Sequence, residues 1–191
     1  MKTLRQQTAV MVTGPAGAGK STIAVVLARV LPAVLIDNDV TPGTIDPLLT
    51  GEARREARAA AYDALTDAAL DAARSGAHVV VAAPLSEERR DARAWDHLCD
   101  RFADAGAQAV LAWIRVPAGD LLERLAARSA DRDEVKLANP EAWLREADPG
   151  TPPDAAHIEI DGKLPAEEAA GALLAALYGG RPVTEREACS S

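Results

Sequence analysis

The sequence predicts one α/β domain with a parallel sheet of about five strands and helices on both faces. Two observations carry this prediction. Short apolar runs alternate with longer segments of helical periodicity, which is the pattern of strand–helix–strand units. The chain has 191 residues, of which 48% are hydrophobic, and this is enough for the core of a single domain of ordinary size.

The expected strands are short apolar runs, and the expected helices carry apolar residues at intervals of three and four positions. The expected strands are 8–13, 33–36, 78–83, 108–116 and 156–160. The expected helices are 20–30, 52–75, 87–105, 118–130 and 164–178. Because proline and glycine end regular structure, the boundaries are placed at Pro32, Gly76, Pro84 and Gly106.

The stretch 131–153 interrupts this alternation. It is rich in charge and holds several helix-ending residues, which are Pro140, Pro149, Gly150, Pro152 and Pro153. A long polar stretch in a compact domain is usually functional, so we expect a lid at about 130–153. The polar stretch 181–191 is expected to be a flexible tail, which leaves a single domain over 1–180.

One motif lies between the first expected strand and the first expected helix. The residues Gly14-Pro15-Ala16-Gly17-Ala18-Gly19-Lys20-Ser21 fit G-x-x-x-x-G-K-[ST] without a mismatch. This context indicates a phosphate-binding P-loop, whose glycines let backbone N–H groups close around phosphates at a helix N-terminus. We expect Lys20 to reach the β- and γ-phosphates of a nucleotide and the Ser21 hydroxyl to bind Mg²⁺.

Two carboxylates, Asp37 and Asp39, follow the second expected strand. Ligands of open α/β sheets bind at the carboxyl ends of strands, and residues two apart in an extended chain point the same way. One carboxylate can hold Mg²⁺ through water while the other accepts a proton from an attacking hydroxyl. The alternative is a polar turn. The third strand ends without an acidic residue, which weakens a motor or GTPase interpretation and shifts the metal role to Asp37.

Four cations are spaced by four residues, and they form one basic stripe if their segment is helical; they are Arg124, Arg128, Arg132 and Lys136. A bound polyphosphate would relieve their mutual repulsion. Arg128 and Arg132 are the catalytic candidates, because arginines that close over a transferring phosphoryl group stabilise its charge and exclude water. The alternative is a solvated surface paired with nearby acids, which are Asp120, Glu123, Asp131 and Asp133.

Composition disfavours several classes of function. A net charge of −8 and an aromatic content of 3% argue against binding to nucleic acid. The sequence shows neither a membrane-spanning apolar run nor the apolar run of a signal peptide, and its two cysteines and three histidines form no zinc pattern. We therefore expect a soluble cytoplasmic protein, monomeric or homodimeric, with no nucleic-acid or membrane partner.

The P-loop continued by Thr22, the pair Asp37-x-Asp39 and the spacing Arg124-x-x-x-Arg128 before a lid resemble a known family. The family is that of the P-loop small-molecule kinases, which includes gluconate kinase, shikimate kinase, chloramphenicol phosphotransferase and related bacterial predicted kinases. The resemblance covers most of the chain. It implies a three-layer, nucleoside-monophosphate-kinase-like P-loop NTPase fold with strand order 2-3-1-4-5 and a lid.

The resemblance also implies roles for individual residues. Asp37 would be the carboxylate on the metal side, and Asp39 the carboxylate on the acceptor side. Arg124 would lie along the adenine, and Arg128 on the phosphates. The P-loop from Gly14 to Thr22 would bind the nucleotide.

The expected function is Mg²⁺-assisted transfer of the γ-phosphate of ATP to a hydroxyl of a small metabolite or antibiotic. A nucleoside monophosphate kinase stays open, because Arg54, Arg55 and Arg58 could bind an acceptor phosphate. A third possibility, from another class, is an ATP-binding regulatory or switch protein with little turnover. The loop 41–51 matches no substrate signature, so the sequence names no particular acceptor.

Overall fold

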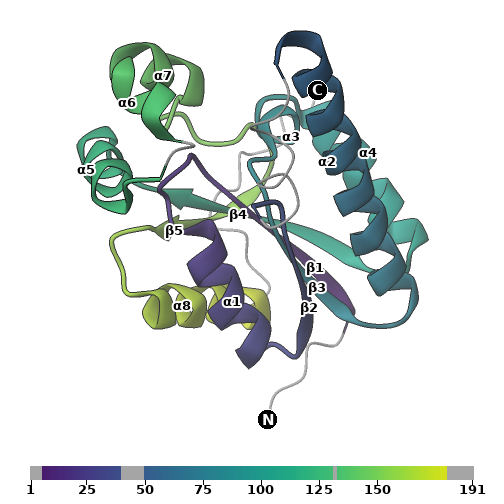
Figure 1. Cartoon of the computed structure of the whole chain (residues 1–191). Helices are drawn as coiled ribbons and strands as arrows, with labels where there is room; N and C mark the ends of the chain where they lie inside the picture. Colours follow the sequence, from purple (N-terminus) through teal and green to yellow (C-terminus); the bar gives the residue numbers. More distant parts are fainter. Residues whose placement is uncertain (1–5, 40–49, 131–132, 180–191) are drawn as a thin grey trace, which may run out of the picture.

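The computed structural model describes residues 6–39, 50–130 and 133–179. Five strands in these ranges form one sheet in the order β2-β3-β1-β4-β5, and each neighbouring pair is parallel (Figure 1). The strands are β1 (Thr8–Thr13), β2 (Ala33–Asp37), β3 (His78–Ala82), β4 (Gln108–Arg115) and β5 (His157–Asp161). The predicted α/β class and the strand order implied by the resemblance are confirmed, and this is a P-loop NTPase fold.

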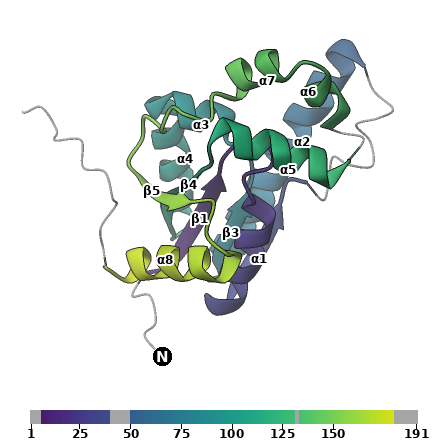
Figure 2. The same cartoon turned by 90° about the vertical axis from the view of Figure 1, so that its left-hand side faces the viewer.

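Helices cover both faces of the sheet, as predicted (Figure 1). On one face lie α1 (Lys20–Val30) and α8 (Ala166–Gly179), and on the other lie α2 (Gly51–Arg74) and α4 (Ala92–Asp104). A short helix, α3 (Ser86–Arg90), follows β3. Figure 2 shows three more helices above the carboxyl ends of the strands, which are α5 (Ala118–Arg128), α6 (Glu134–Ala138) and α7 (Pro140–Ala147).

The central strand β1 explains why the apolar runs are continuous. Val10 and Val12 point into the cluster beneath α1 and α8, whereas Ala9 and Met11 point into the cluster beneath α2 and α4. All four side chains are at most 2% exposed. A parallel strand buried on both faces needs apolar residues at every position, so the run carries no alternation.

The expected helix 87–105 is wrong as a single element, because the structure divides it into α3 and α4. The break lies at Asp91, whose backbone is extended (φ −133°, ψ 110°). The Asp91 carboxylate accepts a hydrogen bond of 2.9 Å from the backbone N–H of Arg93 and caps α4. Aspartate is among the residues most favoured at the N-cap position of a helix.

The expected lid stretch contains helices α6 and α7. Asn139 accepts a hydrogen bond of 3.1 Å from the backbone N–H of Ala142, and Pro140 begins α7 where its missing N–H costs nothing. Trp143 of α7 packs against the core cluster beneath α1 and α8. Its motion as a lid stays a prediction.

The carboxyl end of α7 is tied to α3. The Arg89 guanidinium, which is buried, donates to the carbonyl of Ala147 at 2.8 Å and to that of Asp148 at 3.3 Å. The backbone N–H of Asp154 donates to the carbonyl of Arg89 at 3.1 Å.

None of the helices in the described ranges is long and apolar enough to cross a membrane.

Candidate functional site

The P-loop joins β1 to α1 at the carboxyl edge of the sheet. Gly14 has a φ of +151°, and a Cβ atom built there would lie 3.0 Å from the backbone oxygen of Ile114 on the neighbouring strand. Gly19 has a φ of +94° and immediately precedes α1. Both positions therefore favour glycine, the first for close approach and the second for a left-handed backbone. The loop leads directly into the N-terminus of α1. The first N–H groups of a helix have no carbonyl partner within that helix, so they are available to bind an anion.

Lys20 turns back over the loop that precedes it. Its Nζ atom donates to the carbonyls of Gly14 at 2.9 Å and Pro15 at 3.0 Å. Burial lowers the pKa of Lys20 to about 8, against the opposing effect of Asp39 and Asp37, and the cations Lys136 and Arg128 lower it further. An ammonium in these surroundings is stabilised by an anion such as a phosphate.

The two carboxylates after β2 are arranged by a turn. The strand ends at Asp37, whose Oδ1 accepts a hydrogen bond of 2.9 Å from the backbone N–H of Asp39. The backbone N–H of Asn38 donates to the carbonyl of Ala82 at 2.9 Å, which ties the turn to β3. The chain is therefore not extended from Asp37 to Asp39, but both carboxylates lie close enough to Lys20 to raise its pKa. Asp39 lines the cavity described next, and Asp37 supports the backbone of Asp39.

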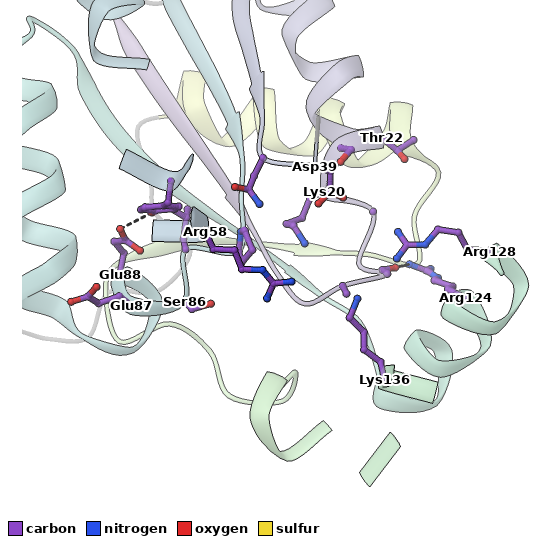
Figure 3. A pocket seen from close by; sticks show the side chains of 18 residues that line it. Lys20, Thr22, Asp39, Arg58, Ser86, Glu87, Glu88, Arg124, Arg128 and Lys136 are labelled. Atoms are coloured by element: carbon purple, nitrogen blue, oxygen red, sulfur yellow. Dashed lines mark hydrogen bonds between the residues drawn. The ribbon is translucent and has the colours of Figure 1, made fainter. Parts of the chain in front are cut away.

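A cavity of about 750 Å³ lies above the carboxyl ends of β1, β2 and β3. It begins at the P-loop and extends between α2 and α3 on one side and α5 and α6 on the other (Figure 3). Its lining includes backbone or side chains from the P-loop and the β2 turn, which are Ala16, Gly17, Gly19, Lys20, Ser21, Thr22, Asn38 and Asp39. Six of the nine predicted P-loop residues thus line one space with Asp39, whereas Gly14, Pro15 and Ala18 do not line it.

Cations from α5 and α6 form one wall of this cavity, the wall on the right in Figure 3. Arg124 donates to the carbonyl of Gly162 at 2.8 Å and to that of Gly17, within the P-loop, at 3.4 Å. Arg128 and Lys136 line the same wall. Arg124 is therefore fixed between the P-loop and the turn after β5.

The single helical stripe expected for these cations does not form. Helix α5 ends at Arg128, and Ser129 adopts a left-handed backbone with a φ of +48°. Lys136 belongs to the separate helix α6, and Arg132 lies outside the described residues. Arg128 and Lys136 meet instead on the carboxylate of Asp133, one of the four acids named in the alternative interpretation of a solvated surface. The pairing with Asp133 agrees with that alternative, but Asp133 is buried and not solvated.

The opposite wall comes from α2 and α3, and sequence reasoning missed most of it. Ser86, Glu87 and Glu88 of α3 line the cavity together with Arg58 and Tyr62 of α2 (Figure 3). The signal available in the sequence was their position directly after β3, because loops at the carboxyl ends of parallel strands meet at one edge. These acids follow Pro84, which ends the expected strand 78–83, and they belong to a separate short helix.

Tyr62 and Glu88 fasten the two helices of this wall to each other. The Tyr62 hydroxyl donates to Oε1 of Glu88 at 2.6 Å, and the Glu88 side chain is 8% exposed. Burial raises the pKa of Tyr62, and the hydrogen bond to Glu88 raises it further, so the phenol stays protonated at neutral pH. This wall is therefore polar and carries both acids, Glu87 and Glu88, and one cation, Arg58.

The residues at the P-loop fit a magnesium–nucleotide complex. The described residues contain no group of three or more His, Cys, Asp or Glu side chains arranged to hold a metal ion. Mg²⁺ in such sites usually takes one or two protein oxygens and completes its shell with water and phosphate oxygens. Ser21 and Asp39 line the cavity, and Asp37 lies close enough to Lys20 to raise its pKa; hydroxyl and carboxylate oxygens are the ligands that Mg²⁺ prefers.

The sequence from 10 to 149 matches the model of the family described as AAA domain. The chain belongs to this family. The match includes the P-loop, the β2 turn, the α2–α3 wall and the cations of α5 and α6, and thus every element that lines the cavity. No curated protein matches the chain.

Solved structures share the fold of this AAA-domain chain at low sequence identity. A gluconokinase from Sinorhizobium meliloti 1021 is 20% identical, with a TM-score of 0.61 over 92% of this chain and 94% of that chain. The Mycobacterium tuberculosis APS kinase in complex with AMPPNP and APS is 22% identical, with a TM-score of 0.61 over 91% and 98%. Shikimate kinase from Acinetobacter baumannii in complex with shikimate is 17% identical, with a TM-score of 0.55 over 92% and 95%.

Proposed function

We propose that this protein is an ATP-dependent phosphotransferase that moves the γ-phosphate of ATP to a hydroxyl group of a small molecule. One observation carries the proposal. A single cavity of about 750 Å³ extends from the P-loop, past Lys20 and Asp39, to the α2–α3 wall, so a nucleotide phosphate and a second small molecule fit side by side. The solved kinases of the same fold support a reaction of this class.

Lys20 and the P-loop would bind the phosphates of ATP. In the structure, the Lys20 ammonium donates hydrogen bonds to two loop carbonyls, but burial still disfavours its positive charge. The negative charge of a bound triphosphate would stabilise the ammonium. Ser21, together with Asp37 acting through water, would hold Mg²⁺, which would neutralise the charge that develops during transfer. The cations of α5 and α6 would face the phosphates from the other side.

Asp39 would accept the proton of the acceptor hydroxyl. As the O–H bond breaks toward the carboxylate, the hydroxyl oxygen forms a bond to the γ-phosphorus. The bond between that phosphorus and the oxygen bridging the β- and γ-phosphates breaks, and ADP leaves with the electron pair. Because Asp37 accepts a hydrogen bond from the backbone of Asp39, it would keep the base in position. In this proposal Asp39 is the base and Asp37 is the metal ligand, and the variants described in the Discussion test this assignment.

The α2–α3 wall favours an alcohol over a phosphate as acceptor. It presents Glu87 and Glu88 to the cavity, and carboxylates accept hydrogen bonds from hydroxyl groups but repel a phosphate. Of the three arginines that kept a nucleoside monophosphate kinase open, Arg58 lines the cavity, whereas Arg55 pairs with Glu52 on the exposed surface. Because the cationic Arg58 lines the cavity, a nucleoside monophosphate, whose phosphate it could bind, stays the second candidate for the acceptor.

A test measures ADP release from MgATP without acceptor and then with separate panels of sugars, sugar acids, amino alcohols and nucleoside monophosphates. Acceptor-dependent ADP release with a sugar or an amino alcohol, and mass spectrometry that finds one added phosphoryl group on a hydroxyl, would support the proposal. Preferential phosphorylation of nucleoside monophosphates would replace it with the second candidate. Slow hydrolysis that no acceptor and no metabolite extract accelerates would favour a nucleotide-binding switch.

A further inference from the structure

The Asp133 carboxylate links the two helices that carry the cationic wall. Arg128, at the end of α5, donates to Oδ2 through Nε at 2.8 Å and also through Nη2. Lys136 of α6 donates to Oδ1 at 2.5 Å. The Asp133 side chain is 0% exposed, although none of the five residues of α6 is buried. A single buried carboxylate thus bridges two cations from two helices.

Capping of α6 does not explain this aspartate. Asp133 occupies the N-cap position of α6, where an aspartate usually accepts a hydrogen bond from the first turn of the helix. Its backbone is helical there (φ −103°, ψ −10°), and within the described residues its side chain makes no capping hydrogen bond. Both carboxylate oxygens are directed to Arg128 and Lys136 instead.

The bridge is ionic. Burial alone would raise the pKa of Asp133, but the hydrogen bonds from Lys136 and Arg128 outweigh burial and lower the pKa below its ordinary value. A buried carboxylate is costly unless its hydrogen bonds are satisfied, and here each oxygen has a charged donor. The negative charge is therefore present at neutral pH, and it holds the guanidinium and the ammonium near each other.

The two bridged cations face the same space as Lys20. Arg128 and Lys136 line the cavity, and both lower the pKa of Lys20, which shows that three positive charges act on one volume (Figure 3). These charges repel one another. Asp133 does not itself line the cavity, so it compensates the repulsion from behind and leaves the cations directed at the space where an anion would bind.

We propose that Asp133 is a positioning residue for phosphate binding, which acts by holding Arg128 and Lys136 in the cavity wall. The proposal rests on the function proposed above, because it takes the anion to be the polyphosphate of ATP. Without Asp133, repulsion would drive the two side chains apart, and each would have to be ordered again when the nucleotide binds. That ordering reduces affinity for the nucleotide.

The test is a thermodynamic cycle on binding of MgAMPPNP, measured by isothermal titration calorimetry. Four proteins are compared: the wild type, Asp133→Asn, the double variant Arg128→Gln/Lys136→Gln, and the variant with all three changes. We expect Asp133→Asn to weaken binding by about tenfold in the wild type, the size of a lost charged hydrogen bond. In the double variant the same change should have no further effect, because Asp133 acts through the two cations that are already removed.

The matched control is Asp120→Asn. Asp120 is also an aspartate of this region, at the start of α5; it is half-buried, pairs with Lys163 at 2.9 Å and does not line the cavity. This variant should bind MgAMPPNP as the wild type does. Thermal melting of each protein separates loss of affinity from loss of fold. If Asp133→Asn does not fold, Asp133→Glu takes its place in the cycle, since it keeps the charge and displaces it by one methylene.

Two results would overturn the proposal. One is an unchanged dissociation constant in a folded Asp133 variant, and the other is an equal loss of affinity in both backgrounds, which a general structural role would produce. Failure of the wild type itself to bind MgAMPPNP is a different result. It would refute the proposed function and, with it, the phosphate-positioning role, whereas binding by the wild type without coupling refutes the role of Asp133 alone.

Discussion

The P-loop and the turn from α5 to α6 both bring cations to one cavity, but they do so by different physical means. The P-loop positions Lys20 through a few consecutive residues, whose glycines permit the required backbone and whose carbonyls accept from the Lys20 ammonium. At the second site, α5 ends at Arg128, and Lys136 of the separate helix α6 meets Arg128 on a buried carboxylate. The position of Lys20 therefore depends on the backbone conformation of neighbouring residues, whereas the positions of Arg128 and Lys136 depend on the charge of Asp133.

This difference leads to an expected order of sensitivity to substitution. Changes beside the P-loop should affect the chemical step, since the reacting atoms would lie there. Changes in the α5–α6 turn should affect binding and closure more than chemistry, because their cations are held indirectly. The predictions that follow are ordered from the largest expected effect to the smallest.

The largest effect is expected from Asp39→Asn. The amide keeps the shape of the side chain but cannot accept the hydroxyl proton, and a positioned base contributes about 10²–10⁴-fold to turnover. Steady-state kinetics should therefore show a large loss of kcat with little change in the dissociation constant of MgATP. The matched variant Asp37→Asn should affect kcat less. A loss of MgATP affinity with unchanged kcat would place Asp39 on the metal.

Lys20→Ala should reduce phosphoryl transfer by about 10²–10³-fold, the loss typical when one preorganised donor to a developing charge is removed. The fold should persist, because burial disfavours the charged form of Lys20, as its lowered pKa indicates, and the substitution removes this buried charge. Single-turnover kinetics and circular dichroism measure the two effects. Lys163→Ala, which removes a lysine from an exposed ion pair, is the control. Wild-type turnover by Lys20→Ala would end the P-loop kinase proposal.

Hydrogen exchange should distinguish the two helices of the expected lid. Without ligand, α6 should exchange faster than α7, because α6 has no buried residue whereas Trp143 and the Arg89 hydrogen bonds fasten α7. MgAMPPNP with an acceptor should slow exchange mainly in α6.

Arg128→Gln should reduce this protection and lower kcat/KM by about tenfold, the value of a charged hydrogen bond. Equal exchange with and without ligands would contradict closure and return these cations to a structural role.

The smallest effect concerns pH. The protonated form of Lys20 is the one that binds phosphate, and its pKa is lowered to about 8, so the charge is present below that pH and is lost above it. Affinity for MgAMPPNP should therefore be about twofold weaker at pH 8 than at pH 6.5, and binding near pH 8 should take up protons. Calorimetry in buffers of different ionisation enthalpy measures this uptake. Binding without proton uptake would show that Lys20 is not the titrating partner.

The P-loop, the α/β class and the main elements could be predicted because each depends on residues that are close in the sequence. The spacing of glycines and lysine from Gly14 to Lys20 specifies a backbone conformation, and the apolar runs specify buried strands. The break at Asp91 was missed because the residues around it have helical periodicity on both sides, and the cap is formed by one side chain.

The walls of the cavity were decided by tertiary structure. Arg124 meets the carbonyl of Gly17 across 107 positions, and the Tyr62 hydroxyl meets Glu88 across 26. Such contacts depend on how helices pack over the sheet, and no periodicity encodes them. The same holds for Asp133, which the sequence presents as one of several acids among exposed cations. Its charge-bridging role arises because α5 ends at Arg128 and Lys136 of the separate helix α6 meets Arg128 on the Asp133 carboxylate.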